Sequence, residues 1–273
     1  MAVTNPIART AFYCCVIRAD DASSAAPVCG DTLAARFFDD AIRRDVEPLL
    51  RFKEPAASNV ARHRLIDDLV REHIRRDPNA RIILLGAGFD TRAFRLEGGR
   101  YVEIDDPNLF AYKEDRLPAA TAPNPLTRIP VTFAETRPDV FLAPLAGDDR
   151  ALVVLEGVSM YLRPEAIAEL VAALVRALPR ATLVCDLMSV RFVRAGNRRL
   201  KHALAALGVA FHEPAEHPSH VITAAGYRPI ARYSIIERAR QAGSLRVPRL
   251  LLATVFRWVR DGYQVWVFEP RPA

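Results

Sequence analysis

The sequence predicts a single α/β unit built on a doubly wound, mostly parallel sheet of seven strands, with a helical extension before it. Short apolar runs alternate along the chain with segments of helical periodicity, which is typical of consecutive βα units. The first of these runs ends in a glycine-bearing turn, Gly86-Ala87-Gly88. No internal repeat or low-complexity linker divides the 273 residues into separate parts.

Two helices are expected before the first strand. Apolar residues such as Leu33, Phe37 and Val46 recur at near-helical spacing over 32–50, where Pro48 should kink or end the helix. A second helix is expected over 56–76, with Asp77-Pro78 as its stop. We therefore expect residues 1–78 to form an N-terminal helical extension or lid, and 79–273 to form the ligand-binding core.

The core alternates between strands and helices. Further helices are expected over 107–116, over 164–178, where Pro164 suits a first helical turn, and over 190–207. The last two strands alternate in polarity and are expected to pair antiparallel at the edge of the sheet. Strands are expected over 81–85, 101–104, 126–132, 152–155, 182–187, 227–236 and 262–268.

Composition and charge exclude several classes of protein. With 51% hydrophobic and 26% charged residues, the chain is globular and is neither disordered nor collagen-like. The net charge is +6, but the arginines are spread from Arg9 to Arg271, usually beside acidic residues, which is typical of a solvated surface. We therefore expect no nucleic-acid partner.

The cysteines and the apolar segments indicate a reduced protein away from membranes. No C-x-x-C spacing occurs among the four cysteines, so neither a metal site nor a disulfide framework is expected. No apolar run approaches the roughly 18 residues that span a bilayer, and no secretory signal pattern opens the sequence. The expected localisation is cytoplasmic, without a membrane partner. Sequence does not predict the oligomeric state.

The glycine turn and the acids after the second strand predict a nucleotide-like ligand. Glycine lets a bound molecule approach the backbone closely, and Glu103 and Asp105 follow Gly86 by 17 and 19 residues. A carboxylate at this distance can accept hydrogen bonds from ribose hydroxyls of a dinucleotide or of S-adenosylmethionine. Asp105 or Asp106 could instead cap the helix that begins at Pro107. A dinucleotide fingerprint would have Gly or Ala where this chain has Thr91, which disfavours a nicotinamide cofactor.

Three motifs together resemble the leucine carboxyl methyltransferase family. They are LGAGFDTR at 85–92, EIDDP at 103–107 and EGVSMYL at 156–162, in that order. Upstream, Thr10-Ala11, Arg18-Ala19, Phe38-Asp39-Asp40 and ARHRLIDD at 61–68 are similar to N-terminal signatures of the family. The resemblance covers roughly residues 9–187. It implies a class I, Rossmann-like methyltransferase that uses S-adenosyl-L-methionine and yields S-adenosyl-L-homocysteine, related to O-methyltransferases of polyketide pathways in secondary metabolism.

The resemblance also implies roles for particular residues in holding the cofactor. An arginine fork matches a carboxylate, and a carboxylate suits an ammonium group. The implied contacts are Arg62 with the methionine carboxylate, Gly86 and Gly88 along the cofactor, Asp105 or Glu103 with the ribose, and Glu156 with the methionine amine. Next to the adenine the family usually has Asp-Leu, whereas this chain has Thr132-Phe133; here Phe133 would stack on the adenine and Thr132 would hydrogen-bond it.

Catalytic residues depend on the methyl acceptor. A carboxylate is already ionised at neutral pH and needs no base, whereas a hydroxyl must lose its proton. Histidine and carboxylate concentrate in FHEPAEHPSH at 211–220, so the candidates for a base or a substrate contact are His212, His217 and His220, together with Tyr161 after the fourth strand.

The function that follows is O-methylation of a carboxylate or hydroxyl on a small acidic or phenolic metabolite by in-line transfer. Holding the acceptor in line with the methyl group would supply much of the rate acceleration. Two alternatives stay open, a nicotinamide-dependent oxidoreductase and a non-catalytic module that binds the cofactor and interacts with another macromolecule.

Overall fold

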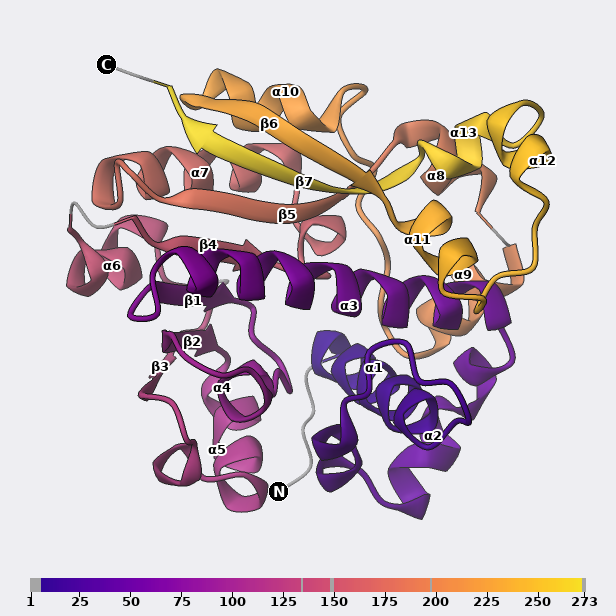
Figure 1. Cartoon of the computed structure of the whole chain (residues 1–273), viewed down its shortest axis with the longest axis horizontal. Helices are drawn as coiled ribbons and strands as arrows, with labels where there is room; N and C mark the ends of the chain where they lie inside the picture. The colour runs from indigo at the N-terminus through magenta and orange to yellow at the C-terminus, as the bar shows by residue number, and fades with distance from the viewer. Residues whose placement is uncertain (1–5, 134, 148–149, 197, 272–273) are drawn as a thin grey trace.

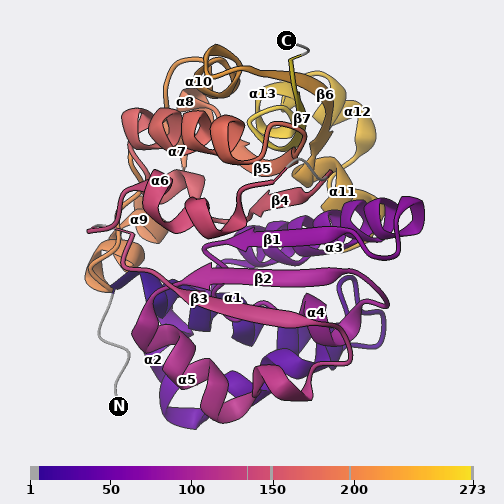
Figure 2. The ribbon, with the colours of Figure 1, turned by 90° about the vertical axis from the view of Figure 1, so that its left-hand side faces the viewer.

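Seven strands form one sheet in the order β3-β2-β1-β4-β5-β7-β6 (Figures 1 and 2). The computed structural model describes residues 6–133, 135–147, 150–196 and 198–271. Strands β1 to β5 are parallel, and β7 lies antiparallel between β5 and the edge strand β6. Their bounds are Arg81–Leu85 (β1), Arg100–Asp105 (β2), Leu126–Pro130 (β3), Leu152–Leu155 (β4), Thr182–Met188 (β5), Tyr227–Ser234 (β6) and Tyr263–Pro270 (β7).

The predicted fold class is confirmed. All seven expected strands are present, and the last two pair antiparallel with β6 at the sheet edge. The central strands β1 and β4 are almost fully buried, as expected of apolar runs covered on both faces. The chain order reverses between β1 and β4, so the switch point lies where ligands of doubly wound sheets bind.

Helices cover both faces of the sheet. The α-helical segments within the described residues are Pro6–Ala22 (α1), Asp40–Leu50 (α2), Lys53–Arg76 (α3), Arg92–Arg95 (α4), Pro107–Arg116 (α5), Pro138–Leu142 (α6), Pro164–Ala177 (α7), Val190–Ala195 (α8), Arg198–Ala206 (α9), Pro218–Ala224 (α10), Ile235–Gln241 (α11), Arg249–Ala253 (α12) and Arg257–Arg260 (α13). One hydrophobic cluster joins α3 and α11 to one face, and another joins α6, α7 and α10 to the opposite face. Figure 1 shows α3 lying along the sheet.

A third hydrophobic cluster joins the N-terminal helices to the end of the sheet toward which the parallel strands point (Figure 1). At its centre Phe89, in the turn after β1, stacks on Phe37 with ring centroids 4.8 Å apart and packs against Phe12 of α1 at 4.9 Å. The side chain of Arg18 also donates to the Phe89 carbonyl at 2.8 Å. These contacts seat α1 over the glycine turn. The division of the chain at residue 78 remains a prediction, and α3 shares its core with the sheet.

Two predicted helices are each divided. The segment over 32–50 forms a 3-10 helix, Thr32–Phe37, and then α2, because the Asp39 side chain caps a new helix by accepting from the Ile42 amide. Pro48 lies inside α2, which continues two residues further to Leu50. The segment over 190–207 stops at Ala195, next to Gly196, before α9 begins. Helix α1 was not predicted, since its run from Phe12 to Ile17 is almost continuously apolar.

Candidate functional site

The turn after β1 has a backbone conformation that requires glycine. Gly86 has a φ of +67° and Gly88 a φ of +50°, a region that favours glycine. A Cβ on Gly86 would lie 2.5 Å from Cγ2 of Val158, so the segment after β4 packs directly on this turn. The turn therefore brings the first and third family-like motifs into contact.

Asp105 at the end of β2 points into this turn. Its Oδ2 accepts from the Gly88 amide at 2.6 Å, and its Oδ1 accepts from the Asp106 amide at 2.7 Å. Burial raises the pKa of Asp105 above its usual range, while the Gly88 and Asp106 amides oppose that shift. The helix cap that sequence assigned to either acid belongs to Asp106, whose side chain accepts from the Asn108 amide at 2.8 Å.

Glu103, the other candidate for the ribose, lies elsewhere. Its fully buried carboxylate accepts from Lys113 Nζ at 2.8 Å and from Arg128 Nε at 3.0 Å. These two cations join β2 to α5 and β3. Of the two acids, the structure brings only Asp105 to the glycine turn.

Arg62 and Glu156 meet at the carboxyl end of β4 and pair with each other; the cofactor contacts expected of them stay predictions. Arg62 Nε donates to Glu156 Oε1 at 3.2 Å, although the two residues belong to α3 and to the turn after β4. Burial alone would raise the pKa of Glu156, but the guanidinium groups of Arg92 and Arg62 hold it well below its usual range. Glu156 is therefore an ionised carboxylate beside an arginine. The carboxylate suits an ammonium group, and the arginine suits a carboxylate.

Sequence reasoning missed two further partners of Arg62. Its NH1 group donates to Asp186 Oδ2 at 3.2 Å and to the Tyr263 hydroxyl at 2.5 Å, and that hydroxyl donates to Asp186 Oδ2 at 2.6 Å. Asp186 interrupts the apolar run of β5, a signal that could have singled it out. Tyr263 carries no comparable signal, since it lies 201 residues from Arg62 and only the antiparallel β7 brings it close.

Gly157 is required at this cluster. Its φ is +68°, and a Cβ there would lie 2.9 Å from NH2 of Arg62. Its amide also donates to Asp186 Oδ1 at 2.7 Å. Because Gly157 has no side chain, the Arg62 guanidinium can approach the ends of the strands. The Gly157 amide also holds the second oxygen of Asp186.

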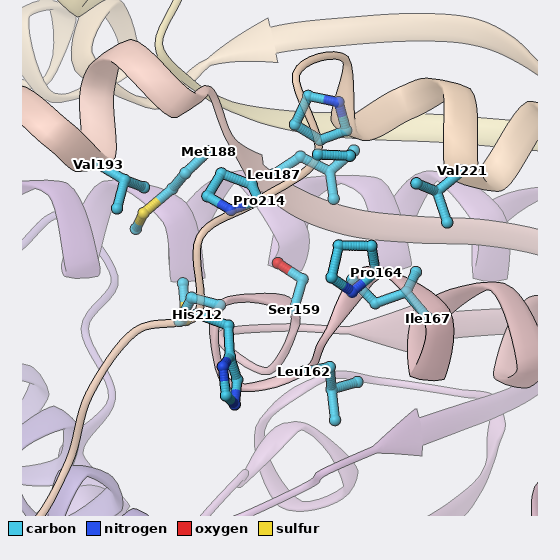
Figure 3. A pocket seen from close by; sticks show the side chains of 13 residues that line it. Ser159, Leu162, Pro164, Ile167, Leu187, Met188, Val193, His212, Pro214 and Val221 are labelled. Atoms are coloured by element: carbon cyan, nitrogen blue, oxygen red, sulfur yellow. The ribbon is translucent and has the colours of Figure 1, made fainter.

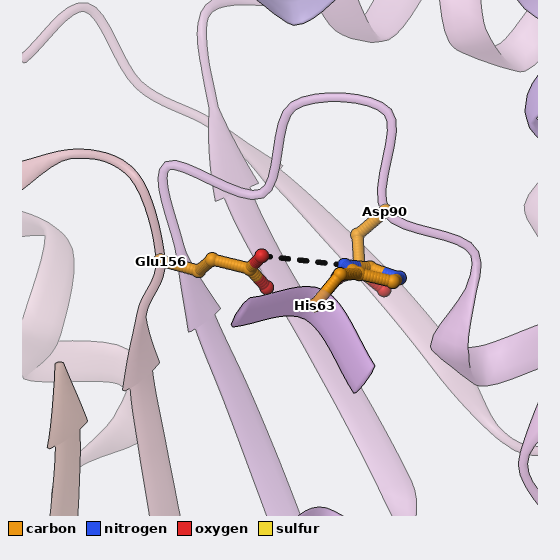
Figure 4. A group of neighbouring side chains, drawn as sticks. All are labelled: His63, Asp90 and Glu156. Atoms are coloured by element: carbon orange, nitrogen blue, oxygen red, sulfur yellow. Dashed lines mark hydrogen bonds and ion pairs between the residues drawn. The ribbon is translucent and has the colours of Figure 1, made fainter. Parts of the chain in front are cut away.

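His63, Asp90 and Glu156 gather in a group whose ligand-type atoms lie within 4.8 Å of one another (Figure 4). The fully buried guanidinium of Arg92 lies among them. It ion-pairs with Asp90, donates to Glu156 Oε2 at 2.7 Å and lies 3.1 Å from Nδ1 of His63. The positive charge that a metal ion would supply already comes from Arg92, which also holds the second oxygen of Glu156.

The segment after β3 runs beside Asp105. The Val131 amide donates to the Asp105 carbonyl at 2.8 Å, so Thr132 follows the end of β2 closely. The Phe133 side chain is 39% exposed and packs edge-on against Phe141 of α6, with centroids 5.6 Å apart. The adenine contacts of Thr132 and Phe133 stay predictions.

Tyr161 lies under α1 and is poorly suited to act as a base. Its hydroxyl donates to Thr10 Oγ1 at 3.3 Å, and burial raises its pKa to about 12, so the phenol stays protonated at neutral pH. Nearby, the buried hydroxyl of Tyr13 in α1 has no hydrogen-bond partner among the described residues. An unsatisfied buried hydroxyl is unfavourable unless a ligand or water completes it.

The three candidate histidines are all exposed and occupy two different settings. The rings of His217 and His220 contact each other, with centroids 4.7 Å apart, on the surface. His212 instead lines a narrow apolar pocket beside the 3-10 helix Ser159–Tyr161 (η4), to which its amide is tied by a 2.9 Å hydrogen bond to the Met160 carbonyl (Figure 3). The pocket is lined by Ser159, Met160, Leu162, Pro164, Ile167, Leu187, Met188, Val193, His212, Pro214, Ala215, Pro218 and Val221.

Known proteins resemble this chain in both sequence and fold. The sequence profile of the leucine carboxyl methyltransferase family matches residues 11–175. A Streptomyces coelicolor protein named "Putative S-adenosyl-L-methionine-dependent methyltransferase" is 36% identical over 125 residues, 43% of each chain. A Frankia alni protein of the same kind of name is 33% identical over 147 residues, 51% of this chain and 48% of the relative. The matches thus span less than half the length of these relatives.

Solved structures resemble the fold at low sequence identity. The crystal structure of a Thermobifida fusca protein named "putative methyltransferase" has a TM-score of 0.60 at 13% identity and covers 92% of this chain and 97% of its own. A geranyl diphosphate methyltransferase in complex with S-adenosylmethionine has a TM-score of 0.51 at 13% identity over 80% of this chain and 90% of its own. No helix in the described ranges is long and apolar enough to cross a membrane. The profile match covers more than half of the chain and confirms the predicted family: this protein belongs to the leucine carboxyl methyltransferase family.

Proposed function

We propose that this protein is an S-adenosylmethionine-dependent O-methyltransferase that acts on a carboxylate or hydroxyl of a small metabolite. The proposal rests on one arginine–glutamate pair and one acid suited to a ribose, which lie at the carboxyl ends of two parallel strands, β4 and β2. Arg62 and Glu156 meet after β4, and Asp105 faces the glycine turn after β1. The names of the relatives support methyl transfer from S-adenosylmethionine.

The residues at this edge fit the chemical groups of that cofactor. Asp105 would hold the ribose hydroxyls, Arg62 the methionine carboxylate and Glu156 the methionine amine. At Gly88 the nearest atom to an added Cβ would be Cβ of Ala11 at 3.8 Å, and the Tyr13 hydroxyl, which has no partner among the described residues, is available to a ligand that lies under α1. The bound cofactor would supply an electrophilic methyl group on a sulfonium.

The protein's own residues would then orient this molecule and exclude water. Arg62 is already held by Asp186 and Tyr263, so its guanidinium needs little rearrangement when Glu156 turns to the amine. Helix α1 lies against the glycine turn, because Arg18 donates to the Phe89 carbonyl and a Cβ on Gly88 would lie 3.8 Å from Cβ of Ala11. A fixed orientation in a site shielded from water favours in-line transfer between an acceptor oxygen and the methyl group.

Calorimetry tests the proposal directly. S-adenosylhomocysteine should bind with a measurable heat, and at about 100 times its Kd it should raise the free energy of unfolding by about 2.7 kcal/mol. NAD is the control for the oxidoreductase alternative and should give no heat. Absence of binding by both S-adenosylmethionine and S-adenosylhomocysteine would disprove the proposal.

Arg62→Ala should weaken the binding of S-adenosylhomocysteine about 10- to 150-fold, since it removes a charge-assisted contact of about 1.5–3 kcal/mol. Arg64→Ala is the matched control. Arg64 lies on the same helix, and its 43% exposed side chain pairs with Asp68. Equal affinity of the Arg62 and Arg64 variants would remove Arg62 from the site.

A further inference from the structure

We propose that the surface formed by α12, α13 and the turn before them binds to membranes that contain anionic lipids. Two features carry this inference, namely a group of exposed apolar side chains and a run of arginines beside it that includes no acid. It goes beyond the proposed function and does not depend on it. It also departs from the expectation of no membrane partner, which rested on the lack of a spanning segment and of a signal pattern rather than on any surface feature.

Apolar side chains are exposed together on this surface. Leu250, Leu251, Val255 and Phe256 are 73%, 40%, 65% and 40% exposed. Four of the eight large apolar side chains that are exposed in the described ranges therefore fall within seven residues. Single exposed apolar residues are normal, but a contiguous group indicates a contact surface. We call residues 246–258 the α12–α13 patch.

The fold holds this patch in place. Leu252, in the middle of α12, is 2% exposed and anchors the helix. At the other end the Ser234 hydroxyl donates to the Arg260 carbonyl at 2.5 Å, and the Ser189 amide donates to the Gly262 carbonyl at 2.8 Å. These bonds tie the patch to the last residue of β6 and to the residue after β5. Figure 1 shows α12 and α13 at one corner of the molecule, beside α8.

The charge of the same stretch is entirely positive. Residues 242–260 contain four arginines and no Asp or Glu. Arg246 and Arg249 are exposed and form no ion pair or hydrogen bond with the described part of the chain, whereas the other two arginines share Asp261. Two cations beside the apolar group are therefore available to external anions.

An anionic lipid surface matches both features. Apolar side chains on such a surface enter the boundary between headgroups and acyl chains by roughly 5–10 Å, while arginines beside them extend to the headgroups. Trp258, over whose ring Arg191 lies at 5.0 Å, is a residue type that concentrates at membrane interfaces. Each arginine near an anionic surface strengthens binding about fivefold.

A second copy of this chain fits the patch less well. A symmetric contact brings the same surface of both copies together. Arg246 and Arg249 of one copy would then face the same arginines of the other, and the stretch contains no acid to separate them. Like charges that meet across an interface are unfavourable, so the charge of the patch favours lipid over self-association.

Sedimentation with vesicles tests the proposal on the full chain without cofactor. The probes are vesicles of phosphatidylcholine alone and vesicles that also contain about 30% phosphatidylserine. We expect at least tenfold tighter binding to the anionic vesicles, and weaker binding when the salt concentration rises from about 0.1 M to about 0.5 M. No binding to the anionic vesicles would overturn the proposal in favour of a protein partner, and equal affinity for both kinds of vesicle would also refute it.

Two double variants test whether the patch makes this contact. Leu250→Ser/Val255→Ser removes the two most exposed apolar side chains of the patch. Arg246→Ser/Arg249→Ser removes the two arginines without partners. Each double variant should bind the anionic vesicles at least tenfold more weakly. Unchanged binding by both variants would place the contact elsewhere and overturn the proposal.

Matched controls lie away from the patch. Val140→Ser replaces a 63% exposed apolar side chain of α6. Arg75→Ser/Arg76→Ser removes the same amount of charge from side chains that are 73% and 70% exposed. These two arginines end α3 just before β1, at the amino ends of the parallel strands, whereas the patch is tied to the residue after the carboxyl end of β5. Both controls should keep vesicle affinity within twofold.

Two further measurements make the result specific. Light scattering should show no change of oligomeric state in Leu250→Ser/Val255→Ser; a dimer that this variant converts to a monomer would overturn the proposal, because the patch would then join two copies. Both patch variants should keep the urea unfolding midpoint and the Kd of S-adenosylhomocysteine of the unmodified protein. Vesicle binding and cofactor binding are measured separately, so failure of this proposal is distinguishable from failure of the proposed function.

Discussion

Replacing Tyr263 by phenylalanine tests the arrangement that sequence did not predict. The hydroxyl of Tyr263 accepts from Arg62 at 2.5 Å and donates to Asp186 at 2.6 Å, so the Tyr263→Phe variant loses two hydrogen bonds to charged groups. Each such bond contributes about 1.5–3 kcal/mol. Arg62 and Asp186 keep their direct contact at 3.2 Å, and Asp186 keeps the Gly157 amide, so part of this loss is compensated. We expect the free energy of unfolding to fall by about 1.5–3 kcal/mol.

The same substitution should weaken cofactor binding. Without the hydroxyl, Arg62 is less firmly held in the orientation that meets the cofactor's carboxylate. A loss of about 1 kcal/mol in binding corresponds to roughly a fivefold higher Kd. Urea unfolding and calorimetry with S-adenosylhomocysteine measure the two effects independently.

Tyr227→Phe is the matched control for this experiment. Tyr227 is also a fully buried tyrosine of the two antiparallel strands, but its hydroxyl has no hydrogen-bond partner among the described residues. Removing an unsatisfied hydroxyl is nearly neutral. If Tyr263→Phe and Tyr227→Phe give the same unfolding free energy and the same Kd, the role assigned to Tyr263 is refuted.

Three further predictions concern buried charged residues in and around the site. Asp105→Asn should raise the Kd of S-adenosylhomocysteine about 10- to 150-fold, measured by calorimetry. Glu103→Gln should leave that Kd unchanged but lower the free energy of unfolding in urea by about 3–5 kcal/mol, because Lys113 and Arg128 lose their counter-ion. Burial raises the pKa of Asp105, and its ionised form accepts the ribose hydrogen bonds, so the affinity for S-adenosylhomocysteine should be highest well above that pKa and should fall as the pH drops through it. The fall should begin at a higher pH than for an ordinary aspartate; a pH titration of the Kd should show it, and Asp105→Asn should reduce it. Arg92→Met leaves buried carboxylates without their counter-ion and should lower the free energy of unfolding in urea by about 3–5 kcal/mol. A decrease of less than about 1 kcal/mol would contradict the role of Arg92 as the counter-ion of Glu156.

Strands and the longest helices could be predicted because their signals are local. The run 81–85 is apolar, β-branched and bounded by a glycine turn, and the strand has those bounds. Helix α5 likewise begins at Pro107, where proline and the preceding acid mark a first turn. Helix α1 was missed because it is buried on several sides, so that its apolar residues show no single face.

Short motifs singled out residues that lie near the carboxyl ends of the parallel strands. Arg62 of α3 contacts Glu156 after β4, and Asp105 at the end of β2 contacts the glycine turn; their roles in binding the cofactor stay predictions. Glu103 could not be separated from Asp105 by sequence, because its partners Lys113 and Arg128 come from two other elements. Contacts of that kind depend on sheet order and register, which periodicity does not specify.

A crystal structure of the protein with S-adenosylhomocysteine would show where the cofactor binds. We expect its ribose hydroxyls within about 3 Å of the Asp105 carboxylate and its amino-acid carboxylate paired with the Arg62 guanidinium. A ligand bound away from the glycine turn, or one that leaves Arg62 and Asp105 with only the protein partners described above, would contradict this expectation.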